Sequence, residues 1–244
     1  MKPIYIPKGK AKEYGDYAIN IYTGCPHRCY YCFAPSVLRK DREAFHGNVE
    51  PRKDIVESVK KQLKTEQITD KLIHLCFTCD PYPAGCSTAA TTEVIKAIKQ
   101  SGNHVQILTK NAAAAALDFG ILDENDWFGI TLTGAKREQE PNATDPQNRL
   151  FMLAVARNRG IKTWASFEPV IDAEWVLSCI AAHGEIFDKI KIGKLNYHPS
   201  SINWSEFGKR AESLCTERGF DFYIKESLRQ EIMRKCQGGG QHGN

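Results

Sequence analysis

Hydrophobic and polar residues follow two different periods along the chain, and segments with one period alternate with segments with the other. Short runs rich in β-branched and aromatic residues predict strands, and longer stretches with apolar residues every three or four positions predict amphipathic helices. The predicted strands are Tyr17–Tyr22, Lys71–Thr78, His104–Thr109, Trp127–Thr133, Lys162–Phe167, Phe187–Gly193 and Asp221–Ile224. The predicted helices are Asp54–Thr65, Thr91–Gln100, Ala112–Ala116, Gln147–Asn158, Glu174–Ala182, Ser205–Arg218 and Glu226–Lys235.

Strands that alternate with helices imply a parallel sheet with helical crossovers. We therefore predict the α/β class and a single-domain, partial (β/α)6 TIM-type barrel, with a doubly wound sheet as the alternative. The expected divisions are an N-terminal extension over 1–16, the barrel over 17–225, and a C-terminal helix with a disordered Gly-rich tail over 226–244. In either layout, ligands gather where the carboxyl ends of the strands meet, so polar residues at strand ends are site candidates.

Composition excludes several classes of protein. Of 244 residues, 42% are hydrophobic and 25% are charged, which is ordinary for a globular domain and unlike a disordered or collagen-like chain. No apolar run approaches the roughly 18–20 residues that span a bilayer, and the N-terminus lacks the apolar core of a secretory signal. We expect a cytoplasmic protein with no membrane partner. A net charge of +4 permits a nucleic-acid partner without arguing for one.

Three of the nine cysteines fall within eight residues. Cys25, Cys29 and Cys32 have C-x3-C-x2-C spacing in a loop that follows the first predicted strand. Three thiolates on a tight loop can hold three corners of a [4Fe–4S] cluster, which leaves the fourth iron open to a small molecule. The alternative is a zinc site completed by His27 or His46, although zinc sites usually carry two separated cysteine pairs.

This triad, with the aromatic Phe33 beside its last cysteine, resembles the radical S-adenosylmethionine (SAM) superfamily. The resemblance implies a reduced [4Fe–4S] cluster that passes one electron to bound SAM. The cleaved cofactor would yield a 5′-deoxyadenosyl radical that abstracts hydrogen from a substrate. SAM and a one-electron donor of the flavodoxin or ferredoxin type are the implied partners.

Further motifs resemble the spore photoproduct lyase-like branch, also called DNA repair photolyase-like. They are Thr78–Tyr82, Leu108–Lys110, Ile130–Thr133, and Arg149–Leu150 followed by Gly160–Ile161. By this resemblance, Thr78, Cys79 and Asp80 end the second strand, where the family binds the amino group and ribose of SAM, and Lys110 and Arg149 approach the SAM carboxylate. The strand-end rule adds Glu168, which could face the ribose, the substrate or Lys194. The cofactor-binding candidates are Tyr31, Phe33, Thr78, Cys79, Asp80, Lys110, Thr131, Thr133, Arg149 and Glu168.

The catalytic candidate is Cys79, as a thiol that contacts the cofactor or donates hydrogen. Cys76 and Cys86 could join it in a second metal site, but in a strand Cys76 and Cys79 would point to opposite faces. Cys179 and Cys215 suit buried positions in helices, and Cys236 falls in the tail. His27, inside the cysteine loop, is expected to be exposed, with contact to the surroundings of the cluster as the alternative. Tyr31 has core packing as its alternative role.

The sequence also departs from the branch. In spore photoproduct lyase, a hydrogen-donor cysteine stands two positions before the cofactor-binding serine. If Cys79 takes the place of that serine, this chain has Phe77 at the donor position. The tyrosine that partners the donor cysteine is replaced by Phe33. The thymine-dimer repair relay is therefore not present as such, and the substrate stays open, with nucleic acid or protein possible. The alternative from another class is a non-catalytic iron–sulfur or zinc protein that senses redox state or binds nucleic acid.

Overall fold

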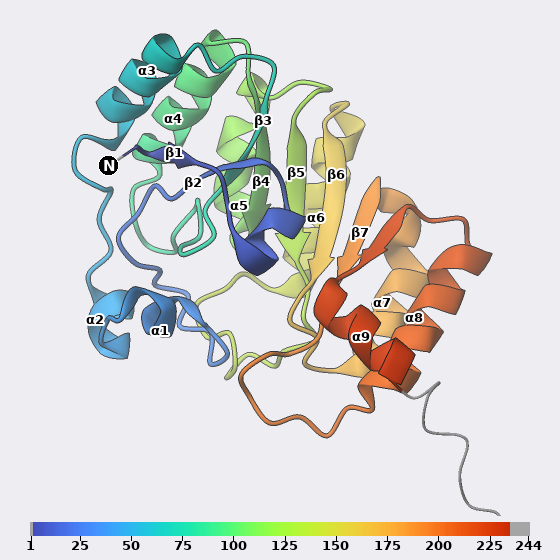
Figure 1. The fold of residues 1–244 in the computed structure, drawn as a ribbon. Helices are drawn as coiled ribbons and strands as arrows, with labels where there is room; N and C mark the ends of the chain where they lie inside the picture. The colour runs from blue at the N-terminus through green and yellow to red at the C-terminus, as the bar shows by residue number, and fades with distance from the viewer. Residues whose placement is uncertain (1, 235–244) are drawn as a thin grey trace, which may run out of the picture. The chain divides into compact units, whose positions relative to one another are not determined.

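The computed structural model describes residues 2–234 (Figure 1). The chain divides into two compact units, the first made of residues up to Ile130 together with Arg137–Thr163, and the second of Thr131–Lys136 with the residues from Trp164 onward. The predicted disordered tail and Cys236 lie outside the described residues. Within residues 2–234, no helix has the length and apolar character needed to cross a membrane.

The first unit is built on a mostly parallel sheet. Its strands are β1 (Ile4–Tyr5), β2 (Tyr17–Ile19), β3 (Leu72–Leu75), β4 (His104–Thr109) and β5 (Trp127–Thr131). β1 pairs antiparallel to β2, and β2 to β5 are parallel neighbours in chain order. Apolar side chains from the central strands are completely buried, among them Ile73, Leu75, Val105 and Ile107.

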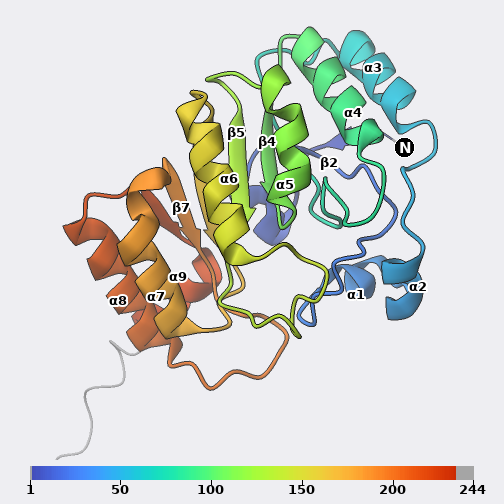
Figure 2. The same cartoon turned by 180° about the vertical axis from the view of Figure 1, so that it is seen from behind.

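Helices connect these strands and bury one apolar face each. They are α1 (Ala34–Leu38), α2 (Arg42–Gly47), α3 (Ile55–Glu66), α4 (Ala89–Gln100), α5 (Ala112–Ala115) and α6 (Pro146–Asn158), with 3₁₀ turns at Gly9–Glu13 and Ala116–Ile121. Figure 2 shows α4, α5 and α6 covering one side of β4 and β5. Val94, Ile95 and Ile98 form the buried stripe of α4, as their spacing predicts.

The second unit repeats the pattern. Its parallel strands are β6 (Lys162–Phe167), β7 (Lys189–Ile192) and β8 (Phe222–Ile224). They alternate with α7 (Ala173–His183), α8 (Trp204–Glu217) and α9 (Glu226–Arg234), with a 3₁₀ turn at Gly184–Ile186. α8 and α9 lie side by side (Figure 1), and Ile232 fills the space that a side chain at Gly208 would need.

The α/β class is confirmed, but one strand end that matters for the site is wrong in the prediction. β3 ends at Leu75, and Cys76 adopts a left-handed backbone with φ of 69°. Thr78, Cys79 and Asp80 therefore lie in a loop that follows the strand. The argument that Cys76 and Cys79 face opposite sides also fails, because strand alternation does not apply to residues that lie beyond the end of β3.

Candidate functional site

The cysteine loop connects β2 to α1 and carries Cys25, Cys29 and Cys32. Cys29 is buried and the other two are half-buried. The loop turns tightly, because Cys32 N donates to Cys29 O at 3.1 Å. Gly24 is required at the start of the loop, since a Cβ there would lie 2.1 Å from the carbonyl oxygen of Phe45.

Burial dominates the acidity of these three thiols. It raises the pKa of Cys25 well above its ordinary value and that of Cys29 to about 11. Burial also raises the pKa of Cys32, although the charges of Lys110 and Arg42 oppose it. Without a metal, the thiols hold their protons at neutral pH, and metal binding would release them.

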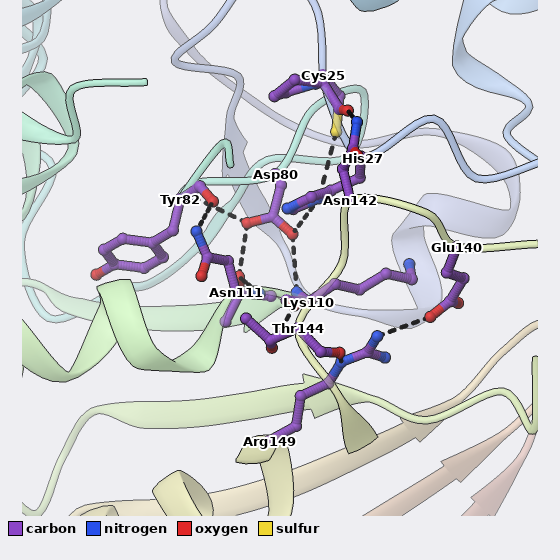
Figure 3. A network of polar contacts seen from close by, with 12 residues as sticks. Cys25, His27, Asp80, Tyr82, Lys110, Asn111, Glu140, Asn142, Thr144 and Arg149 are labelled. Atoms are coloured by element: carbon purple, nitrogen blue, oxygen red, sulfur yellow. Dashed lines mark hydrogen bonds and ion pairs between the residues drawn. The ribbon is translucent and has the colours of Figure 1, made fainter. Parts of the chain in front are cut away.

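His27 belongs to this loop and is 2% exposed, so the expectation that it is exposed is wrong. Its Nδ1 atom lies 3.3 Å from Oδ2 of Asp80 and 3.6 Å from Sγ of Cys25 (Figure 3). The positive φ of Arg28, 56°, turns the chain directly after His27. The other ring nitrogen, Nε2, is buried without a hydrogen-bond partner in the described part of the chain.

Asp80 joins three segments of the first unit. Its carboxylate accepts hydrogen bonds from Oγ1 of Thr109 at 2.6 Å, from the backbone N–H of Lys110 at 2.8 Å and from that of Tyr82 at 2.9 Å. Burial opposes ionisation, but the charge of His27 and these hydrogen bonds lower the pKa of Asp80 below its ordinary value. The carboxylate thus holds the loop after β3 against the end of β4 and the cysteine loop.

Glu140 anchors a second group of buried side chains. Its carboxylate accepts hydrogen bonds from Nη2 of Arg149 at 2.7 Å and from the hydroxyl of Tyr31. Arg149 also donates from Nε to the carbonyl of Thr144 at 2.8 Å. Burial opposes the charge on Glu140, but Lys110 and Arg149 lower its pKa. Arg149, predicted to pair with a cofactor carboxylate, is thus paired with the carboxylate of Glu140, a residue that the sequence did not single out.

Lys110 follows β4, and its side chain runs towards Glu140 (Figure 3). Its Nζ atom lies 5.5 Å from the ring centroid of Tyr31 and forms no ion pair within 4 Å among residues 2–234. Burial opposes its charge, but Cys29 and Glu140 raise the pKa of Lys110, so the ammonium stays charged. It is a cation beside the cysteine loop that is open to an anionic ligand.

Three further predicted residues lie in the same unit. Thr78 is held through its backbone N–H by Asn20 at 2.9 Å, while its Oγ1 is buried without a partner in the described chain. Cys79 is buried beside Cys76. Burial opposes ionisation of Cys79, but the neighbouring Cys76 thiol lowers the pKa of Cys79. Phe33 is 47% exposed at the start of α1.

The remaining predicted residues belong to the second unit. Thr131 and Thr133 are buried, and Oγ1 of Thr133 accepts from Ala135 N at 3.1 Å. Glu168 pairs with Lys225, whose Nζ lies 2.8 Å from its Oε2. The prediction that Glu168 could face Lys194 is wrong, because Lys194 pairs with Glu231.

The spacing of the loop sulfurs bears on the zinc alternative. In the described chain, the set of three ligand atoms lying within 4.8 Å of one another is His104, Asp123 and Asp126, where Lys99 already bonds both carboxylates. The three loop cysteines are not such a set, so at least one pair of their sulfurs lies farther apart. Tetrahedral zinc, with Zn–S bonds of about 2.3 Å, needs sulfurs about 3.8 Å apart.

By comparison with solved structures, the fold is similar to the partial barrels of radical SAM enzymes. The particular likeness is to spore photoproduct lyase in complex with a dinucleoside spore photoproduct, with a TM-score of 0.66 and 13% identity over 90% of this chain and 79% of that one. SuiB of Streptococcus suis bound to the precursor peptide SuiA matches with a TM-score of 0.63 and 12% identity, over 93% of this chain and 53% of that one. The prediction of a partial barrel is confirmed.

Sequence comparison finds relatives among uncharacterised proteins. No family model matches the chain. An uncharacterised protein of Acidianus two-tailed virus, ORF301, is 26% identical over 66% of this chain and 58% of its own length. An uncharacterised protein of Methanocaldococcus jannaschii, MJ0683, is 25% identical over 72% of this chain and 68% of its own length.

Proposed function

We propose that this protein is a radical SAM enzyme that holds a [4Fe–4S] cluster on Cys25, Cys29 and Cys32. The observation that carries the proposal is the position of this triad beside the unpaired ammonium of Lys110, in the fold of radical SAM enzymes. When bound, the cluster and SAM supply one electron and a 5′-deoxyadenosyl radical able to abstract hydrogen.

The residues present suit these groups. Three cysteines fill three corners of a cluster and leave one iron for the amine and carboxylate of SAM. Nε2 of His27 and Oγ1 of Thr78 are buried without a hydrogen-bond partner among residues 2–234, and a bound ligand can satisfy such atoms. Cys25 and Asp80 both contact His27, so the triad and the loop after β3 are linked by one side chain.

The chain's own residues bind the cofactor and hold the surrounding loops in position. Lys110 binds the cofactor carboxylate, because its ammonium lies beside the triad and forms no ion pair within the described residues. Glu140 fixes Tyr31 and holds the guanidinium of Arg149 within the protein. Asp80 orients the loops that carry Thr78 and Lys110, and we keep its direct contact with the amino group and ribose as part of the proposal.

The substrate class is proposed from two kinds of support. The similar structure of spore photoproduct lyase holds a dinucleoside spore photoproduct and that of SuiB holds a precursor peptide, so a nucleic acid or a peptide is the proposed substrate. We propose Cys79 as a hydrogen-donating thiol, because it is buried and paired with Cys76. A flavodoxin- or ferredoxin-type donor in a reducing cytoplasm would supply the electron.

The test is the iron and sulfide content of anaerobically reconstituted protein. We expect about four irons per chain in the wild type and loss of most of them, with the visible absorption, in Cys29→Ala. Cys86→Ala, which removes a half-buried cysteine outside the triad, serves as the matched control and should retain the cluster. Bound zinc without iron, or full iron in Cys29→Ala, would contradict the proposal.

A further inference from the structure

The short helix α2 contacts the cysteine loop through a side chain that the cluster chemistry does not use. Arg42, its first residue, is half-buried and points its guanidinium at the backbone of the loop. Nη2 donates to the carbonyl of Cys29 at 2.6 Å and to that of Tyr30 at 3.0 Å, and Nη1 donates to the carbonyl of Cys32 at 3.3 Å. One side chain therefore bonds three carbonyls, two of which belong to the candidate ligands.

The rest of α2 holds the other end of the loop. Nδ1 of His46 donates to the carbonyl of Cys25 at 2.6 Å, and the carbonyl of Phe45 accepts from the backbone N–H of Cys25 at 3.3 Å. The same Phe45 carbonyl excludes any side chain at Gly24. All three cysteines are thus tied by their backbone to residues of α2, which lies beside α1 (Figures 1 and 2).

These contacts act on the shape of the loop. A loop with several carbonyls facing one direction is unstable without donors, because those groups repel one another and lose water. The planar fork of arginine satisfies neighbouring acceptors at fixed angles, which a lysine ammonium cannot do in the same way. The guanidinium also places one positive charge against the backbone of the loop, and the net charge and hydrogen bonds around a cluster set its reduction potential.

We propose that Arg42 is a positioning residue that shapes the cysteine loop for cluster binding and favours the reduced cluster through its charge. The proposal rests on the function proposed above. The guanidinium of Arg42 donates to backbone carbonyls of the loop, so its effect passes through the backbone of Cys29 and Cys32. Outer contacts of this kind typically change metal affinity about 10- to 100-fold.

The matched control is Arg39, an exposed arginine in the turn between α1 and α2. Arg39→Gln and Arg42→Gln remove the same charge from the same segment, and only Arg42 contacts the loop carbonyls. The variants are purified without metal, their fold is checked by near-ultraviolet circular dichroism, and they are titrated with iron and sulfide under argon. Reduction potentials are read from the electron paramagnetic resonance of whatever cluster each variant holds.

We expect Arg42→Gln to bind the cluster about 10- to 100-fold more weakly than Arg39→Gln, and its residual cluster to have a more negative potential. Arg42→Lys should keep the potential of the wild type, because the charge remains, but should still bind the cluster more weakly. Equal affinity and equal potential in Arg42→Gln and Arg39→Gln would overturn the proposal. If Arg42→Gln does not fold, the affinity of Arg42→Lys decides, and a wild-type value overturns it.

The cysteine variant separates this inference from the function it rests on. If Cys29→Ala retains iron, the proposed cluster site has failed and Arg42 has no cluster to position. If Cys29→Ala loses iron while Arg42→Gln binds it as the wild type does, the cluster site stands and the role of Arg42 is wrong.

Discussion

The two units differ in the ion pairing of the charged side chains that follow their strands. In the first unit, Lys110 follows β4 and its ammonium forms no ion pair within 4 Å in the described chain. In the second unit, Glu168 follows β6 but is paired with Lys225 at 2.8 Å, and Lys194 follows β7 but is paired with Glu231. A strand-end charge that is already paired stabilises the fold and leaves little for a ligand. Position at a strand end therefore does not by itself mark a binding residue.

The largest effect should come from opening the buried pair of the second unit. Lys225 and Glu168 have side chains that are 3% and 16% exposed, so Lys225→Met removes the ammonium from a carboxylate that water reaches poorly. We expect the free energy of unfolding to fall by about 3–5 kcal/mol. Urea denaturation measures this loss, and a variant as stable as the wild type would show that the pair is not the structural contact described here.

The unpaired ammonium of the first unit should behave in the opposite way. Lys110→Met breaks no ion pair, so we expect a stability change of about 1 kcal/mol or less. SAM affinity of the cluster-loaded protein should fall roughly 10- to 150-fold, because a charged hydrogen bond contributes about 1.5–3 kcal/mol. Anaerobic calorimetry measures the affinity, with Lys64→Met, an exposed lysine on α3, as the control. Equal affinities in the two variants would remove Lys110 from the binding site.

Asp80 should make the first unit sensitive to acid. Its folded-state pKa lies below the ordinary carboxyl value, so its contribution to stability is present above that ordinary value and is lost as the pH falls through the folded pKa. Asp80→Asn should cost about 1–3 kcal/mol at pH 7 and should lose less stability than the wild type between pH 5 and pH 3. Parallel pH dependences of the two proteins in urea denaturation would contradict this assignment.

The smallest effect should come from the more exposed pair of the second unit. Lys194 and Glu231 are 21% and 23% exposed, so water screens their interaction. Lys194→Met should change the free energy of unfolding by about 1 kcal/mol or less, against the larger loss expected for Lys225→Met. A loss as large as that of Lys225→Met would mean that burial does not separate the two pairs.

The parts of the molecule that sequence could predict depend on local spacing. The cysteine triad is readable because its members lie within eight residues, and the amphipathic helices are readable because their apolar stripes repeat within each helix. The end of β3 could not be read, because Cys76 and Phe77 continue the apolar pattern of the strand while Cys76 turns into a left-handed backbone. A single residue's dihedral angle moved Thr78 and Asp80 from the strand into a loop.

The site residues that the sequence did not reveal contact partners that are distant along the chain. Glu140 bonds Tyr31 across 109 positions, and no motif surrounds it. Its one available signal is that a buried Arg149 needs a carboxylate partner, which requires knowing that Arg149 is buried. Arg42 likewise reads as one exposed charge among several in the sequence, and its three bonds to loop carbonyls become visible only in the fold.

The most direct measurement of the central claim is the formation of 5′-deoxyadenosine. The protein is reconstituted with iron and sulfide, reduced with dithionite and incubated with SAM without oxygen, and the product is quantified by chromatography. The account predicts product well above that of a variant with Cys25, Cys29 and Cys32 all replaced by alanine. Equal product from the two proteins, or a protein that binds zinc and no iron, would contradict it.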